Sequence, residues 1–391
     1  MFSSNDIISS RQIKRLLVFD LFGAGSLILP AQLARSGNGI GVWSILAGMA
    51  FAGIYLWLLH TCSSRTVSDY MGFLKTGWGN ILSRLLYLCY AVISILVCAW
   101  AAKLLTELVC DSLLDSREFM TALLVILLLA FYGASAGIEA RARIYEILFW
   151  ILVVPLVIML LLCVRQVQVI QWFPLFGNGD AISWSWFWSG TWQCFAAFLP
   201  LTFLLFLVPH EQDQKKSGRA AACAVVISGL ALAVIYLILL GIFGSGALAR
   251  EEYPVITLMG MVKIPGDFLK RLDAVMVGGW FFTLYALIGT TLFYGVVIMH
   301  RALTVSAVSG KADRQDVRDG KADRQEIQDM QGMNGWFFVA AVVVYGIAYG
   351  FHIWPQLEDL AGRMFYLAGV PFAVIVPMIS LLLCKGDAQK S

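Results

Sequence analysis

The chain has 391 residues, of which 60% are hydrophobic and only 14% are charged. Soluble proteins need more surface charge than this, so the composition excludes a soluble globular protein and indicates a polytopic membrane protein. The formal net charge of +3 is small, and the basic residues lie in short loops between apolar runs. We therefore expect no nucleic acid partner.

Ten apolar runs predict ten transmembrane helices, because the core of a lipid bilayer takes about 20 apolar residues per helix. These form one all-α transmembrane domain over 13–384, between a cytoplasmic segment 1–12 and a cytoplasmic tail 385–391. Most of the 28 Lys and Arg residues fall on the side that carries both termini, which predicts that both are cytoplasmic. The predicted spans lie at about 13–33, 40–60, 82–107, 119–137, 145–164, 187–208, 220–246, 273–299, 335–353 and 364–384.

The first span contains "LLVFDLFGAGSLILP", residues 16–30. Gly23 and Gly25 favour non-helical backbone, and Pro30 lacks an amide hydrogen, so the first helix is predicted to unwind here. In transporter folds the backbone groups freed by such a break often bind a solute. A lone Gly-x-Gly fits equally well a surface of small residues that packs against another helix, so the motif alone leaves both interpretations open.

A second interruption falls in the sixth span, at Gly190 and Pro200. If the spans form two inverted repeats of five, about 13–164 and 187–384, the sixth helix corresponds to the first and runs in the opposite direction. Paired breaks favour a binding site at the bilayer midplane.

Asp20 lies near the predicted midplane, where an unpaired charge is costly, so we expect it to be protonated, paired or hydrated. It is the candidate ion or proton site. In the third span, Lys103 and Glu107 have i, i+4 spacing, which predicts an intrahelical ion pair. A contact between Lys103 and Asp20 is the alternative.

The eighth span carries hydroxyl groups in "LIGTTLFYG", on Thr290, Thr291 and Tyr294. Polar groups in a membrane helix either bond to neighbouring helices or line a cavity, and both remain possible here. No two of the four histidines have metal-ligand spacing, and no P-loop, HExxH or GxSxG motif occurs, so we expect no enzyme, metal or cofactor. In the charged loop 301–334, the imperfect "KADRQ" repeat at 311–330 predicts a solvated linker, with a partner-docking segment as the alternative.

Four stretches carry a family resemblance when taken together. They are "ISSRQIKRLLVFDLFGAGSLILP", "GIEARARIYEILF" at 137–149, "FPLFGNG" at 173–179 and "YPVITLMGMVKIPGDFLKRLD" at 253–273. Their combination resembles the spore germination permease family, the B subunits of nutrient germinant receptors within the amino acid/polyamine/organocation transporter superfamily.

The resemblance implies ten helices in two inverted repeats, with the first and sixth helices unwound. It also implies a pocket for a small nutrient, often an amino acid, and a complex with A-type and lipoprotein C-type subunits in the spore inner membrane. On the eighth helix one alignment selects Leu287 and Thr291, and another selects Thr290 and Tyr294. Elsewhere the residues carried over to the pocket are Gly23, Ala24, Gly25, Ser26 and Val97.

Two departures from the family matter. Relatives often have a glutamate in the third helix, where this chain has Ala101, and a Gly-x-Glu in the sixth, where it has "LPLTF". Asp20 is the expected substitute for these missing carboxylates. The sequence thus predicts a B-type germinant receptor subunit that binds a small nutrient, and the alternative is a secondary transporter of amino acids or amines.

Overall fold

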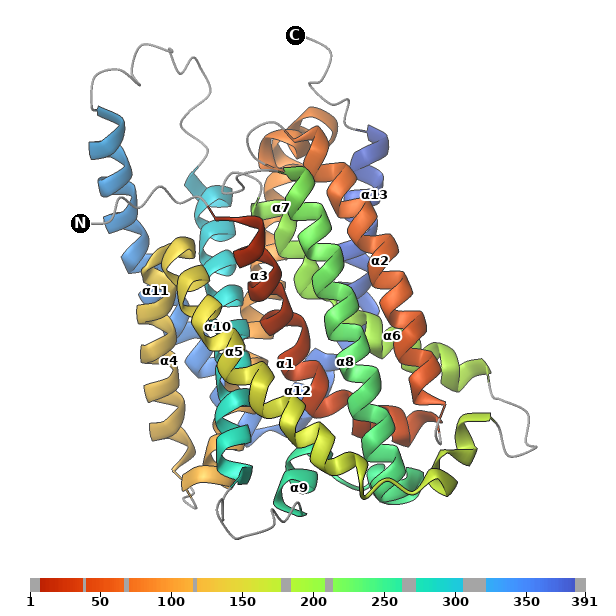
Figure 1. Cartoon of the computed structure of the whole chain (residues 1–391). Helices are drawn as coiled ribbons and strands as arrows, with labels where there is room; N and C mark the ends of the chain where they lie inside the picture. The colour runs from red at the N-terminus through yellow and green to blue at the C-terminus, as the bar shows by residue number, and fades with distance from the viewer. Residues whose placement is uncertain are drawn as a thin grey trace.

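The computed structural model describes residues 8–37, 40–66, 70–114, 118–176, 184–207, 214–261, 272–304 and 321–383, which form a bundle of helices (Figure 1). No β-strand occurs in these ranges. The α-helices are α1 (Ser10–Gly37), α2 (Gly41–Arg65), α3 (Tyr70–Val109), α4 (Phe119–Ser135), α5 (Gly137–Val164), α6 (Trp184–Ala197), α7 (Leu204–Leu207), α8 (Gln214–Leu248), α9 (Pro254–Met261), α10 (Leu272–Thr304), α11 (Lys321–Ile353), α12 (Pro355–Met364) and α13 (Val370–Leu383). Short 3₁₀ or π segments are η1 (Cys110–Leu114), η2 (Val169–Phe176), η3 (Leu199–Phe203) and η6 (Phe365–Gly369).

Each predicted span coincides with a helical segment, which confirms an all-α polytopic membrane protein. Within the described ranges, 8 helices are long and apolar enough to cross a bilayer, or 9 if the bent pair Trp184–Ala197 and Leu199–Leu207 is one span. The apolar helix α4 has only 17 residues, so ten membrane crossings remain a prediction. α1 begins and α13 ends at the same end of the bundle (Figure 1), as the predicted topology requires.

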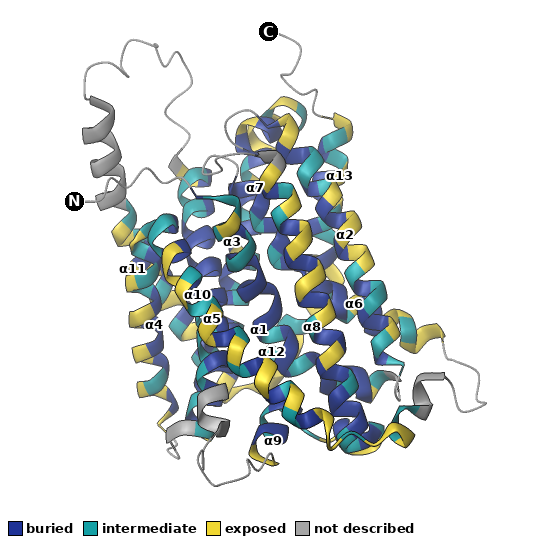
Figure 2. Ribbon diagram, viewed as in Figure 1, coloured by how far each residue is buried: buried dark blue, intermediate teal, exposed yellow. Residues whose placement is uncertain are grey.

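Helices α1 and α10 form the interior of the bundle. In the most apolar stretch of each span, 89% of residues are buried in α1 and 78% in α10, against 28% in α11 and 22% in α5. A helix that is apolar on all sides belongs inside a protein, whereas the outer helices expose one side, as Figure 2 shows. A polar residue in the middle of α1, such as Asp20, is therefore enclosed by neighbouring helices.

The predicted unwinding of the first helix is not found. α1 is helical throughout, including Gly23, Gly25 and Pro30. Gly23 instead allows a close approach, because a Cβ at this position would lie 2.7 Å from both Cβ and Oγ1 of Thr283 in α10. Close packing is a common use of glycine in membrane helices, so the packing interpretation of the motif is correct for Gly23.

The predicted break in the sixth helix is confirmed at Pro200. The α-helix α6 ends at Ala197, the chain continues through the 3₁₀ segment η3, and the two parts are bent by 40°. Pro200 contributes to the break, because its nitrogen has no hydrogen to donate. The interruption predicted at Gly190 is wrong: Gly190 lies inside α6, where a Cβ would come within 2.8 Å of Ser44 Oγ.

Two helices begin earlier in the chain than predicted. α5 begins at Gly137, so residues 137–144 are helix and not a loop. Gly137 itself has a positive φ of 86°. α11 begins at Lys321, so the second copy of the KADRQ repeat is helical, while the first copy lies outside the described residues.

Candidate functional site

α1 and α10 pack antiparallel along a line of polar contacts, which we call the α1–α10 seam and define by Gly23 and Ser26 facing Trp280 and Thr283. Trp280 Nε1 donates to Ser26 Oγ at 2.8 Å, and Ser26 Oγ donates to the carbonyl of Gly23 at 3.0 Å. Thr283 occupies the space beside Gly23. The two predicted pocket residues Gly23 and Ser26 thus fasten α1 to α10.

A buried charge cluster of Asp20, Thr290 and Arg141 continues the seam toward the start of α1. Thr290 Oγ1 donates to Asp20 Oδ1 at 3.1 Å, and Arg141 Nη2 donates to Thr290 Oγ1. Asp20 and Arg141 are each 3% exposed and Thr290 is 0% exposed, so bulk water does not reach them. One hydroxyl group therefore links a carboxylate on α1 with a guanidinium on α5.

Aromatic rings surround the guanidinium. The Arg141 Cζ atom lies 5.6 Å from the ring centroid of Phe293 and 6.0 Å from that of Tyr145, distances typical of cation–π contacts. Gly289 of α10 lies beside the side chain, since a Cβ there would be in van der Waals contact with Arg141 Nε at 3.6 Å. The arginine is therefore packed into the protein and not directed toward lipid.

Hydrogen bonding in the cluster is incomplete. Asp20 Oδ2 and Arg141 Nε and Nη1 are buried and have no hydrogen-bond partner within the described part of the chain. Unsatisfied polar groups are costly in a low-dielectric interior and are rare unless they bind water or a ligand or serve a function. The cluster is for this reason the central element of the candidate site.

The other predicted residues on α1 and α3 lie near this core without forming one polar site. Gly25 is buried and lies in van der Waals range of Ala197 at the end of α6, since a Cβ would be 3.6 Å from it. Ala24 and Val97 are half-buried. Their predicted role in binding a nutrient stays a prediction.

The three hydroxyl residues of α10 have different neighbours. Thr290 joins the charge cluster, whereas Thr291 Oγ1 donates to the carbonyl of Leu287 in its own helix at 2.7 Å. The Tyr294 ring stacks on Phe203 of η3 with centroids 4.7 Å apart. The structure therefore brings Asp20 and Thr290 together and separates Thr291 and Tyr294 from them.

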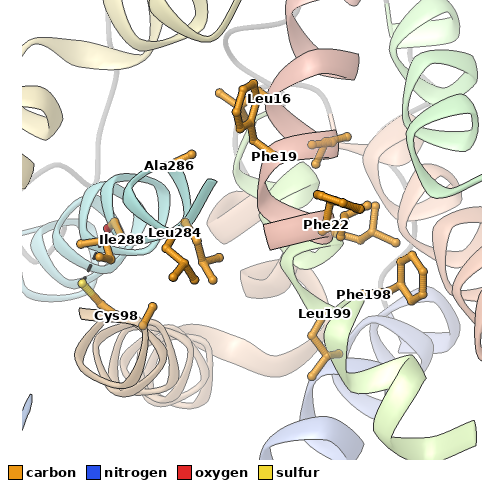
Figure 3. Packing of buried hydrophobic residues seen from close by; sticks show 14 of the residues in the cluster. Leu16, Phe19, Phe22, Cys98, Phe198, Leu199, Leu284, Ala286 and Ile288 are labelled. Carbon is orange, nitrogen blue, oxygen red and sulfur yellow. Dashed lines mark hydrogen bonds between the residues drawn. The ribbon is translucent and has the colours of Figure 1, made fainter. Parts of the chain in front are cut away.

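Apolar side chains of α1, α3, α10 and the break in the sixth helix fill the centre of the bundle, as Figure 3 shows for Phe22, Cys98, Leu199 and Leu284. One carbonyl at the break has a side-chain partner. Thr202 Oγ1 donates to the carbonyl of Leu199 at 2.7 Å and lies 2.7 Å from the Tyr55 hydroxyl. In this arrangement a threonine side chain satisfies the Leu199 carbonyl at the break, in a region where the sequence predicted a bound solute.

Lys103, near the C-terminal end of α3, forms ion pairs with residues other than Asp20. The predicted pair with Glu107 is confirmed, with Nζ to Oε1 at 3.1 Å, and a shorter contact of 2.7 Å joins Lys103 Nζ to Glu358 Oε2 of α12. The alternative contact with Asp20 is not found. Nearby, burial and the carboxylates of Glu107, Glu252, Asp111 and Glu358 raise the pKa of Tyr253, so this end of the bundle is rich in negative charge.

Sequence reasoning missed Arg141, because it assigned residues 137–144 to a loop. A signal was present: Ile138, Ala142 and Tyr145, all buried, follow one another at helical spacing, and Arg141 belongs to the same stripe. Extending the helix upstream would have directed the arginine toward the interior. No group of three or more His, Cys, Asp or Glu residues in the described ranges could hold a metal ion.

A family model described as "Spore germination protein" matches residues 7–309. Among curated proteins of Bacillus subtilis (strain 168), Spore germination protein B2 is 27% identical over 271 residues, covering 66% of this chain and 70% of that protein. Spore germination protein KB is 25% identical over 295 residues, covering 70% of this chain and 74% of that protein.

Solved transporter structures share the fold. A substrate-bound, outward-open Na⁺-coupled sialic acid symporter is 12% identical with a TM-score of 0.69, covering 96% of this chain and 79% of that one. MHP1, a nucleobase-cation-symport-1 family transporter in a closed conformation, is 13% identical with a TM-score of 0.63, covering 92% and 78%. At these identities the likeness establishes the LeuT-like architecture alone.

Proposed function

Because the chain belongs to the spore germination protein family, we propose that it is the membrane-embedded B-type subunit of a germinant receptor, which binds a small nutrient such as an amino acid and signals germination. The observation that carries the proposal is the buried Asp20–Thr290–Arg141 cluster in the bundle interior, together with the break in the sixth helix. This helix break and these polar groups in the bundle interior are what a midplane solute site requires. No catalytic step is assigned to the chain.

The mechanism we propose is a shift between two arrangements of the bundle. In the arrangement described here, Thr202 holds the Leu199 carbonyl and the α1–α10 seam is closed. A nutrient that hydrogen-bonds to the break competes with Thr202 and favours an arrangement in which the seam opens. A ligand shifts such an equilibrium only by its difference in affinity for the two states, so the signal depends on contacts made in one state alone.

A thermal-shift screen tests nutrient binding. The full chain, purified in nanodiscs, is heated with amino acids, sugars and nucleosides, and we expect a saturable rise in melting temperature with one class of nutrient. A ligand at 100 times its Kd stabilises the folded state by about 2.7 kcal/mol. Val226→Ala, at an exposed position on α8, serves as a matched control that should respond like wild type. A folded protein that responds to none of these compounds contradicts the proposal.

The alternative is a secondary transporter of amino acids or amines, and the fold shared with two solute symporters favours it. Liposomes separate the two functions. A transporter reconstituted alone should accumulate labelled solute against its gradient when an ion gradient is applied. A receptor subunit should bind the nutrient without accumulating it, and it should co-purify from spores with A-type and C-type subunits.

The proposed location is the spore inner membrane, with both termini in the cytoplasm. The excess of Lys and Arg in the loops on the side of the termini supports the orientation. A reporter active only in the cytoplasm, fused after Ser391, should be active, and a reporter active only outside should not.

A further inference from the structure

Helix α1 is continuous although three of its residues weaken it. Glycine is a poor helix former and proline the poorest, yet Gly23, Gly25 and Pro30 all lie inside α1. Proline has no amide hydrogen, so Pro30 donates no backbone hydrogen bond to the Ser26 carbonyl four residues earlier, and its ring crowds that carbonyl. The stretch around Ser26 is therefore the part of α1 with the least support from its own backbone.

An indole group of α10 contacts α1 at this stretch. Trp280 Nε1 donates to Ser26 Oγ at 2.8 Å, and Ser26 Oγ donates to the Gly23 carbonyl at 3.0 Å. Trp280 and Ser26 are each 0% exposed, so no solvent hydrogen bond replaces this contact when it breaks. The tryptophan thus supports α1 through a side chain, at the place where the helix lacks a backbone donor.

The hydroxyl of Ser26 occupies an acceptor that a solute would need. A carbonyl oxygen has two lone pairs, and in an α-helix one of them accepts from the amide four residues later. The second lone pair of the Gly23 carbonyl accepts from Ser26 Oγ. A solute with a hydrogen-bond donor, such as an ammonium group, gains this carbonyl only when the serine hydroxyl leaves it.

We propose that Trp280 is a positioning residue that keeps α1 helical and closed to solute. Its indole N–H holds the Ser26 hydroxyl on the Gly23 carbonyl, and opening of the α1–α10 seam begins with the loss of this hydrogen bond. The inference rests on the proposed function in one respect, because it names the contact that a nutrient has to break. The support of α1 by Trp280 does not depend on any nutrient.

The variant Trp280→Phe keeps an aromatic ring and removes the N–H. Losing one hydrogen bond of ordinary strength changes an equilibrium about fivefold, so the open form of α1 should be about five times more populated in this variant. Because the apparent affinity for a ligand rises with the fraction of molecules that can bind it, the variant should also bind solute more tightly. A tryptophan that only fills space would lower the stability when replaced, without improving binding.

Hydrogen–deuterium exchange of the full chain in nanodiscs, without any nutrient, measures the opening of α1. The exchange rate of a buried amide follows its opening equilibrium, so peptides within 21–30 should exchange about five times faster in Trp280→Phe than in wild type. In a chain that already carries Ser26→Ala, Trp280→Phe should add nothing, because the bond is already lost. If Trp280→Phe does not fold, Ser26→Ala alone should still speed exchange, by a smaller factor because alanine favours a helix more than serine.

Trp78→Phe is the matched control, because Trp78 Nε1 also donates to a serine hydroxyl, that of Ser380, at 2.9 Å between α3 and α13. It should leave exchange within 21–30 as in wild type. A folded Trp280→Phe or Ser26→Ala variant with wild-type exchange in α1, additive effects of the two changes, or the same acceleration in Trp78→Phe would each overturn the inference.

A titration separates positioning from packing. A mixture of the common amino acids is added stepwise to wild type and to Trp280→Phe, and the melting temperature is followed. The half-maximal concentration should be up to about fivefold lower in the variant, although the variant alone melts at a lower temperature. An equal or higher half-maximal concentration overturns the inference. A wild type that does not respond contradicts an amino acid as the nutrient, and the exchange measurement still decides on Trp280.

Discussion

At the scale of single residues, Asp20 acts through its partners. Without the fold, Asp20 is an isolated carboxylate, and Asp20→Asn would be a clean test of its role. The structure adds Arg141, which Asp20→Asn would leave buried beside a neutral group. Removing the carboxylate leaves the buried guanidinium without a compensating charge, which is commonly destabilising by about 3–5 kcal/mol, so a lost response in that variant must be compared with its stability.

Thr290→Val is a cleaner change at the cluster. Valine fills the same space but cannot bridge Asp20 Oδ1 and Arg141 Nη2, and both atoms would lack a partner. We expect a loss of about 1–3 kcal/mol in the free energy of unfolding, measured by denaturant unfolding. Thr290→Ser keeps the hydroxyl group and should stay close to wild type. Equal stability of the two variants would show that the hydroxyl bridge does not contribute.

Gly23 and Gly25 offer a matched pair for the packing of α1. A Cβ at Gly23 would lie 2.7 Å from Thr283 atoms, whereas at Gly25 the nearest atom would be 3.5 Å away. Gly23→Ala should therefore lower the melting temperature, because overpacking costs about 1–3 kcal/mol. Gly25→Ala should be neutral or slightly stabilising, since alanine suits a helix better than glycine. The reverse order would contradict the α1–α10 seam.

At the scale of elements, the break between α6 and η3 differs from the continuous α1. Pro200 removes a backbone donor, but so does Pro30, which lies inside the continuous helix α1, so a proline by itself does not decide whether a helix breaks. Gly23 and Gly25 only permit unwinding, and α10 lies close enough to keep α1 helical. The sequence therefore located the break in the sixth helix but could not show that the first helix stays continuous.

Thr202→Val tests whether the Thr202 hydroxyl, by bonding to the Leu199 carbonyl, competes with a nutrient at the break. The variant loses the donor to the Leu199 carbonyl and the contact with the Tyr55 hydroxyl. We expect destabilisation of about 1–3 kcal/mol and a change in the nutrient concentration needed for a half-maximal response. Thr202→Ser is the control. An unchanged response in a folded Thr202→Val variant would remove the proposed competition at the break.

At the scale of the whole molecule, Lys103 connects the two halves of the chain at the acidic end of the bundle. Its contact with Glu358 spans α3 and α12, and both side chains are partly exposed, at 15% and 26%. Glu358→Gln should cost no more than about 1 kcal/mol, and the difference should shrink in high salt. Asp359→Asn, at the exposed neighbouring position, is the control. A salt-independent loss would contradict an electrostatic contact.

The sequence by itself determined the membrane class, the approximate place of each helix, the break at Pro200 and the family. Hydropathy, proline and short motifs are local properties, so a single chain suffices to read them. Only the tertiary structure decided that α1 stays helical, that Arg141 turns inward and that Lys103 meets Glu358. The partners in the charge cluster are separated by 270 and 149 positions in the chain, and the packing of helices alone brings them together.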